Sequence, residues 1–290
     1  MKLKNKQTKQ SDIKLKNKQP DTKLKKQPAV NLKKQPNAKL KEQSNMDFKK
    51  QFEQKFNSLC QNRTRFTTWN DCVHMWAYVI SNACNFRKDR EDKYMNIINK
   101  YSKQEALIIS ELFALLVLIL DEDREQDFLG QFYMDNNFGD VKKGQYFTPY
   151  DIAYMMCEMV SDYSNSNSEP KTVYATINDP TCGTGVMLIA YINKLIKDGY
   201  SPHVKALIVA TDLDPCIALM CYIQLSLFGA AGYICIRNTL TEPMTNHVLY
   251  PPEDAFITPL FFHPIWAARK LLSNNEVVNK QEDNMIGGQI

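Results

Sequence analysis

The sequence predicts an α/β fold with a parallel sheet, preceded by a helical region and a basic N-terminal tail. Three observations lead to this prediction. Strand-like and helix-like segments alternate between residues 172 and 236, a glycine-bearing turn follows the first strand, and helical periodicity fills the preceding residues. We therefore expect a disordered tail (1–45), a helical region (46–140), an α/β domain (141–272) and a flexible C-terminal tail (273–290).

The expected tail differs from the rest of the chain in its charge. Residues 1–45 carry 14 lysines and three acidic residues, whereas the remainder has 22 basic and 29 acidic residues. An imperfect KLKNKQ-like repeat recurs there every 8 to 12 residues. Such units bury too little apolar surface to offset the entropy lost on ordering, so we expect disorder. Their charge suits salt-dependent contact with DNA phosphates, and a solvated tail without a dedicated partner is the alternative.

The helical region has apolar residues at spacings of three and four. The repeating positions are Phe48, Phe52, Phe56 and Leu59, then Val73, Trp76, Ala77 and Ile80, and the pattern continues through 93–100 and 103–120. The longest apolar run, 106–120, is interrupted by Glu111 and is shorter than the roughly 20 residues that span a bilayer. We expect a buried helix there and no membrane association.

The α/β domain is expected to begin with a helix from Asp151 to about Val160, because an aspartate before an apolar run is a good N-cap. A linker rich in serine and asparagine, 161–168, follows it. Strands then alternate with helices, as a parallel sheet requires. The expected strands are Thr172–Ile177, Ala206–Thr211 and Tyr233–Ile236, and the expected helices are Gly185–Leu195 and Pro215–Phe228.

The eight cysteines are scattered and lack the spacing of a zinc site or a disulfide framework. We expect reduced, mostly buried thiols and no metal. The basic N-terminus has no apolar segment followed by a small-residue cleavage site, so we expect no secretory signal and a cytoplasmic location.

The strongest local signal is the turn Asn178–Gly185, NDPTCGTG. Glycines let the backbone approach a ligand closely, and the N-terminus of the next helix offers free N–H groups. A purely structural turn is the alternative. The next strand ends at Asp212, where Rossmann-like nucleotide sites place an acidic residue that binds ribose hydroxyls. Asp214, which precedes Pro215, is expected to cap the following helix.

Four segments together resemble, in order and spacing, the N-6 adenine-specific DNA methyltransferases, and specifically the methylation subunit of type I restriction systems. They are GQYFTP from Gly144, NDPTCGTG from Asn178, ATDLDP from Ala210 and RNTL from Arg237. The likeness covers residues 142–240. It implies a Rossmann-like domain that depends on S-adenosyl-L-methionine.

The resemblance also implies a set of cofactor-binding residues. Tyr146, Phe147, Thr148 and Pro149 would line the methionine end, Asp179, Cys182, Gly183 and Gly185 would form the turn under the cofactor, Asp212 would hold the ribose, and Asn238 would lie near adenine. Many members of the family have an aspartate in place of Asn238, and an asparagine can still exchange hydrogen bonds with an exocyclic amine.

The catalytic tetrapeptide of the family, Asn or Asp followed by Pro-Pro and an aromatic residue, is not present in that form. At about the right distance the chain has Tyr250-Pro251-Pro252-Glu253, in which tyrosine replaces the amide and glutamate replaces the stacking ring. The catalytic residues therefore stay unassigned, with Tyr250, Pro251 and Pro252 as the candidates. For the aromatic segment that starts at Phe256, we expect packing in the core and not a surface that stacks on bases. For His263 we expect a histidine whose hydrogen bonds are satisfied within the protein and not a general base.

The resulting expectation is a DNA adenine methyltransferase of a restriction-modification or mobile-element system. No segment resembles a target-recognition domain, so a specificity subunit or another partner would be needed. A catalytically inactive, methyltransferase-derived protein that binds DNA or a partner is the alternative, because the asparagine is missing. Methylation of RNA or of a protein amide is a third reading that also relies on the missing tetrapeptide.

Overall fold

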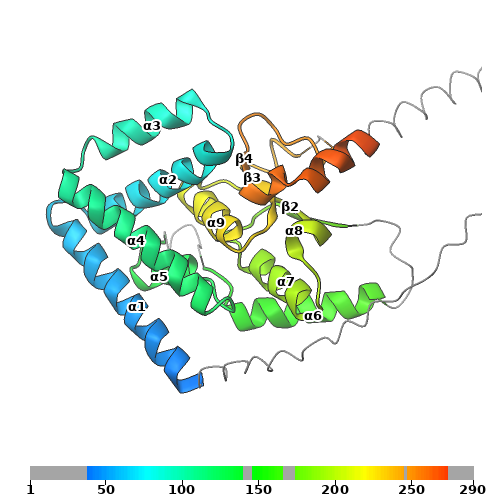
Figure 1. The fold of residues 1–290 in the computed structure, drawn as a ribbon, viewed down its shortest axis with the longest axis horizontal. Helices are drawn as coiled ribbons and strands as arrows, with labels where there is room; N and C mark the ends of the chain where they lie inside the picture. Colours follow the sequence, from blue (N-terminus) through cyan, green and yellow to red (C-terminus); the bar gives the residue numbers. More distant parts are fainter. Residues whose placement is uncertain (1–37, 140–145, 166–173, 245–246, 274–290) are drawn as a thin grey trace, which may run out of the picture. The chain divides into compact units, whose positions relative to one another are not determined.

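The computed structural model describes residues 38–139, 146–165, 174–244 and 247–273 (Figure 1). Most of the expected N-terminal tail and nearly all of the expected C-terminal tail lie outside these ranges. The first helix, α1 (Ala38–Leu59), starts inside the segment expected to be tail. No proline or glycine follows Pro36 there, and its two lysines, leucine, glutamate and glutamine are good helix formers.

In the described part of the chain, the helical region continues through a short 3₁₀ turn, η1, into four further helices. These elements are η1 (Cys60–Asn62), α2 (Arg65–Cys84), α3 (Lys88–Ile98), α4 (Lys103–Glu122) and α5 (Phe128–Asp135). Local hydrogen bonds fix two of the helix starts. The Thr64 hydroxyl accepts from the Thr67 N–H, and Ser102 and Glu105 form a reciprocal capping box.

The predicted apolar stripe of α1 is confirmed. Phe52 and Phe56 are fully buried. Their rings meet the rings of Trp69 and Phe132 edge-on, with centroids 5.2 to 6.4 Å apart. Aromatic pairs prefer this geometry, because the positive edge of one ring faces the negative face of the other. The helical region therefore has an aromatic core built by α1, α2 and α5.

The α/β part follows the predicted alternation of helices and strands. Its elements are α6 (Tyr150–Asn165), β1 (Ala175–Asp179), α7 (Val186–Lys197), α8 (Pro202–Lys205), β2 (Ala206–Asp212), α9 (Pro215–Leu227), β3 (Ala231–Ile236), β4 (Phe256–Ile257) and η3 (Pro259–Phe262). Residues 264–273 are helical. The sheet order is β1-β2-β3-β4, in which β1, β2 and β3 are parallel and β4 is antiparallel to β3.

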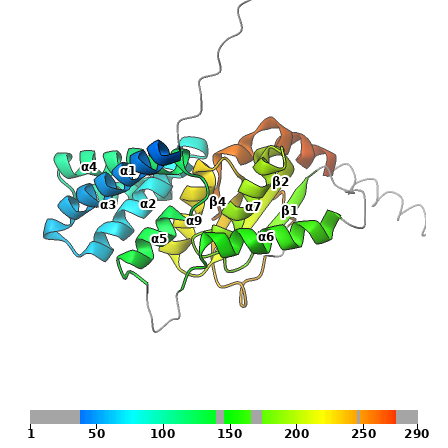
Figure 2. The same cartoon turned by 90° about the horizontal axis from the view of Figure 1, so that it is seen from below.

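The two faces of the sheet bury alternate residues of the same strands. Ile208, Ala210 and Ile234 belong to the core that α7 and α9 share. Leu207 and Ala231 instead pack with Leu249, Phe261 and Trp266 from the C-terminal segment. The C-terminal helix (orange-red) and α6 accordingly lie on opposite sides of the strands (Figure 2). The aromatic segment from Phe256 thus serves mainly as core, as expected, although Phe262 is exposed.

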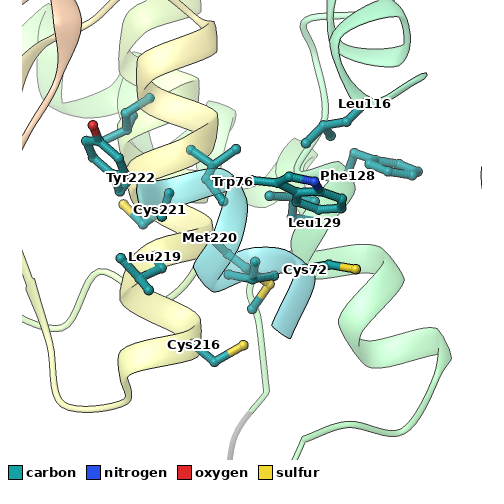
Figure 3. Packing of buried hydrophobic residues seen from close by; sticks show 14 of the residues in the cluster. Cys72, Trp76, Leu116, Phe128, Leu129, Cys216, Leu219, Met220, Cys221 and Tyr222 are labelled. Atoms are coloured by element: carbon teal, nitrogen blue, oxygen red, sulfur yellow. The ribbon is translucent and has the colours of Figure 1, made fainter. Parts of the chain in front are cut away.

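Helix α9 connects the sheet to the helical region. Every residue from Cys216 to Leu225 is buried, and a helix that is buried all round lies inside a core. Side chains of α9 face those of α2 and α5 (Figure 3). In addition, the buried guanidinium of Arg90 in α3 donates to the carbonyl oxygens of Asp254 and Ala255, at 2.9 and 2.8 Å. The helical region and the sheet therefore share one continuous core.

Two local predictions were wrong. Helix α6 starts at Tyr150, so Asp151 lies in its first turn and is not the N-cap, and the helix runs through 161–165, which was expected to be linker. That stretch has no glycine or proline to end the helix. The other strands and helices agree with the prediction to within about two residues where they are described; residues 172 and 173 of the first predicted strand lie outside the described ranges.

The cysteines are free thiols, and six of the eight are buried. No helix within the described ranges is long and apolar enough to cross a membrane. Those ranges also contain no group of three or more histidine, cysteine or acidic side chains arranged to hold a metal ion.

Candidate functional site

The glycine turn joins the carboxyl end of β1 to the start of α7. Gly183 and Gly185 have positive φ angles of 54° and 94°, where side chains are strained. A Cβ atom on Gly185 would also lie 2.8 Å from the Sγ of Cys221. Because Gly185 is the N-cap of α7 and has no side chain, the first N–H groups of that helix have no side-chain cap. The turn thus presents bare backbone at the end of the parallel strands.

Asp212, at the end of β2, holds this turn in place. Its Oδ2 accepts from the N–H of Gly183 at 3.0 Å, and its Oδ1 accepts from the N–H of Asp214 at 2.9 Å. A carboxylate has about four acceptor positions, so the half-buried Asp212 keeps acceptor capacity for a ligand. Burial raises the pKa of Asp212 from its usual value, and hydrogen bonds from backbone N–H groups oppose this shift.

Asp179, at the end of β1, lies beside the same turn. Its Oδ1 accepts from the N–H of Thr181 at 3.1 Å. Burial raises the pKa of Asp179, and the nearby charge of Asp212 adds to the increase. The two strand ends therefore carry two carboxyl groups close enough to influence each other.

Phe147 brings the GQYFTP segment to the turn. Its ring edge lies 3.6 Å from the position that a Cβ atom on Gly183 would occupy. The ring also packs against Tyr133 of α5, with centroids 5.7 Å apart. Tyr146, Thr148 and Pro149 beside it are exposed. Two segments predicted to act together thus meet at Gly183.

The chain after β3 completes the edge. The N–H of Arg237 donates to the carbonyl oxygen of Asp212 at 3.0 Å, and the Thr239 hydroxyl donates to that of Pro180 at 2.7 Å. Between them, the side-chain oxygen of the half-buried Asn238 accepts from the N–H of Leu240 at 3.0 Å. The ends of β1, β2 and β3 therefore lie together.

Asp214 takes the role predicted for it. Its carboxylate accepts from the N–H groups of Cys216 and Ile217, at 2.9 and 3.2 Å, and so caps α9. Asp214 thus has a structural role as a helix cap, and Asp212 remains the residue that is predicted to bind the ribose.

The Tyr250–Glu253 segment lies with the C-terminal helical residues. The Tyr250 hydroxyl donates to the carbonyl oxygen of Lys270 at 3.4 Å, and the neighbouring Leu249 is buried with Trp266. His263 uses its Nδ1 to accept from the N–H of Ile265 at 3.3 Å. Leu249 and Trp266 belong to the core on the face of the sheet that does not pack against α7 and α9.

A cleft of about 950 Å³ adjoins the GQYFTP segment. Phe147, Thr148 and Pro149 line one part of it, and residues of α1, of the segment before α5, of α5 and of the start of α6 line the rest. The glycine turn does not line this cleft. It therefore borders the expected methionine end of the site and not its adenosine end.

Sequence reasoning missed Asp127, the N-cap of α5. This buried carboxylate accepts from the hydroxyl of Thr184 in the glycine turn and from the side-chain amide of Gln224 in α9. The local pattern of an aspartate before an apolar run, with a glycine three residues later, predicts a helix start. Nothing in that pattern indicates a contact with a turn more than 50 residues away.

The fold and the site define a Rossmann-like α/β protein, whose glycine turn lies at the carboxyl ends of parallel strands, where such folds bind ligands. A family model described as N-6 DNA Methylase matches residues 124–286, which is more than half of the chain. The chain therefore belongs to the N-6 DNA methylase family. This confirms the resemblance seen in the sequence, and the match begins before α5, inside the expected helical region.

Comparison with curated proteins found no match. Among solved structures, the chain is similar to one from Listeria monocytogenes described as a putative class I S-adenosylmethionine-dependent methyltransferase, with 15% identity and a TM-score of 0.40. The similarity covers 71% of this chain and 57% of that one. The chain thus spans little more than half the length of that protein.

Proposed function

We propose that the protein binds S-adenosylmethionine at the glycine turn and takes part in methylation of the adenine amine in DNA. The observation that carries this proposal is the meeting of Phe147, Gly183 and Asp212 at one edge of the sheet. Family membership supports the choice of reaction, because the family model that matches the chain is described as N-6 DNA Methylase.

The geometry of the turn fits such a cofactor. Gly183 and Gly185 contribute no side chain to the turn, so a ligand at the turn would meet backbone N–H groups at these two positions; Gly183 faces Phe147, and Gly185 packs against Cys221. Asp212 would accept from the ribose hydroxyls with its remaining acceptor positions, and Asp179, Cys182 and Asn238 would complete the adenosine side. Tyr146, Phe147, Thr148 and Pro149 would enclose the methionine end, next to the cleft.

When bound, the cofactor supplies a methyl group on a sulfonium, which a positioned amine can accept without a strong base. The protein must therefore hold the target amine in line and exclude water. Tyr250, Pro251 and Pro252 are the chain's candidates for this role, but neither an amide nor a stacking ring occupies the expected places. We propose that a partner, such as a specificity subunit of a cytoplasmic restriction-modification or mobile-element system, positions the DNA.

A second function is favoured by one observation, the tyrosine at 250 in place of the expected asparagine. Under this alternative the protein keeps the cofactor pocket, binds DNA or a restriction-system partner, and performs no chemistry.

Two measurements separate these functions. Isothermal titration calorimetry with S-adenosylmethionine tests the pocket, and transfer of a radiolabelled methyl group to unmethylated DNA, with and without candidate specificity subunits, tests the reaction. Binding with transfer supports the enzyme. Binding without transfer under all conditions supports the non-catalytic protein, and no binding refutes both.

A further inference from the structure

We propose that Asp127 is a positioning residue of the cofactor site, which fixes the glycine turn through Thr184 and makes α5 part of that site. The proposal rests on the proposed function for its ligand. Its structural half, that the Asp127–Thr184 contact sets the conformation of the turn, can be tested without any ligand.

Asp127 has hydrogen-bond partners in three separate elements. Its Oδ1 accepts from the N–H of Gly130 at 2.9 Å and from the Nε2 of Gln224 at 2.8 Å. Its Oδ2 accepts from the hydroxyl of Thr184. Gln224 is completely buried and Thr184 almost so, which keeps water from replacing these bonds. One carboxylate thus ties α5, α9 and the glycine turn together.

Thr184 is held at its main chain as well as at its side chain. The same Nε2 of Gln224 donates to the carbonyl oxygen of Thr184 at 2.9 Å, while the Oε1 of Gln224 accepts from the N–H of Leu129 at 3.2 Å. Both the hydroxyl and the carbonyl of Thr184 are therefore anchored to the same network. Little rotation of this residue is possible without breaking a buried hydrogen bond.

The position of Thr184 makes this anchor relevant to a ligand. It lies between Gly183 and Gly185, the two residues with positive φ. The N–H of Gly183 donates to Asp212, the expected ribose ligand. If Thr184 were free to rotate, the neighbouring N–H of Gly183 would change direction. Anchoring Thr184 therefore also maintains the hydrogen bond between Gly183 and Asp212.

Gly130 shows that α5 is shaped for this contact. A Cβ atom at this position would lie 2.2 Å from the Oδ2 of Asp127 and 2.6 Å from the Oγ1 of Thr184. Gly130 is helical and has no positive φ, so close approach and not backbone conformation accounts for the glycine. The first turn of α5 leaves just enough room for the Thr184 hydroxyl to reach the carboxylate.

The test compares Thr184→Val, which removes the hydroxyl at nearly constant volume, with Thr184→Ser, which keeps it. Thr258→Val is the matched control, because Thr258 is also a buried threonine whose hydroxyl is hydrogen-bonded, to the backbone of Ala230 and Gly232, away from the turn. All variants are compared at a temperature at which each is folded, as judged by circular dichroism.

The ligand-free readout is hydrogen–deuterium exchange of residues 181–186. We expect at least tenfold faster exchange there in Thr184→Val, with Thr184→Ser and Thr258→Val close to wild type. Unchanged exchange in Thr184→Val, or an equal increase in Thr258→Val, overturns the positioning role. If Thr184→Val does not fold, Asp127→Ala, which removes both carboxylate oxygens, is measured in its place with the same expectation.

The second readout is the affinity for S-adenosylmethionine. We expect Thr184→Val to bind about tenfold more weakly, which corresponds to about 1.4 kcal/mol, with serine restoring the affinity to within about twofold. Wild-type affinity in Thr184→Val overturns the link between the contact and the ligand. Failure of the wild-type protein to bind refutes the proposed function, while the exchange result still decides whether Asp127 positions the turn.

Discussion

Gly185 offers the sharpest test of the turn geometry. The change is Gly185→Ala, and two costs are expected. A non-glycine residue at positive φ costs about 1 to 2 kcal/mol, and forcing an atom into a packed site costs about 1 to 3 kcal/mol more. The second cost arises because the new Cβ would lie 2.8 Å from the Sγ of Cys221. We expect Gly185→Ala to lower the free energy of unfolding by about 2 to 5 kcal/mol.

Gly199 provides a matched control within the same helix–turn unit. Its φ is 82°, close to the 94° of Gly185, but no atom lies within 4 Å of the position that its Cβ would occupy. Gly199→Ala should therefore show the backbone cost alone, about 1 to 2 kcal/mol. The loss of unfolded-state entropy on replacing glycine by alanine is common to both variants and cancels in the comparison.

Cys221→Ala isolates the steric part. Without the sulfur, the nearest Cys221 atoms to the new Cβ are at 3.5 and 3.6 Å, which is ordinary contact. In urea unfolding of the two single variants and the double variant, we expect a coupling of about 1 to 3 kcal/mol in favour of the double variant. The reasoning is refuted if Gly185→Ala is no more destabilising than Gly199→Ala, or if the coupling is absent.

Three further predictions concern charged groups. Asp212→Ala should weaken S-adenosylmethionine binding about 10- to 100-fold in calorimetry, because hydrogen bonds to a charged group contribute about 1.5 to 3 kcal/mol, and unchanged affinity would exclude the ribose role. Burial raises the pKa of Asp127 in the folded protein. The protonated carboxyl therefore contributes its full stabilisation below the pKa of about 4 in the unfolded chain, and this stabilisation is lost as the pH rises through the higher pKa in the folded protein. Urea unfolding should therefore show the stability of the wild type relative to Asp127→Asn falling as pH rises across that window, and a constant difference would contradict this. Deleting residues 1–37, which leaves α1 whole, should lower both DNA affinity and its salt dependence in fluorescence anisotropy titrations, and an unchanged salt slope would show that the lysines do not contact phosphates.

Much of the α/β part could be predicted because its signals are local. The Asp214-Pro215 pair marks the start of α9, and an unbroken apolar run marks β2. The meeting of Phe147 with Gly183 was expected only through the family resemblance, since no local pattern places the two together. The residue roles that the resemblance implies at the cofactor site remain predictions.

The remaining features depend on contacts between distant parts of the chain. The antiparallel direction of β4 is set by its pairing with β3. A strand of two residues is too short to show a periodic pattern, so the sequence does not predict this direction. The Asp127–Thr184 contact joins a helix cap directly to a turn, and Gln224 donates hydrogen bonds to both residues. No local sequence pattern at any of the three positions predicts this network. The extension of α6 through serine and asparagine shows that composition alone does not end a helix when no proline or glycine is present.

The complete burial of α9 limits how the molecule can be divided. One side of this helix is covered by the sheet and another by α2 and α5, so a fragment confined to the strands and their connecting helices would expose a broad apolar surface to water. We therefore expect that a fragment starting near residue 140, the boundary suggested by the sequence, does not fold stably without α2 and α5.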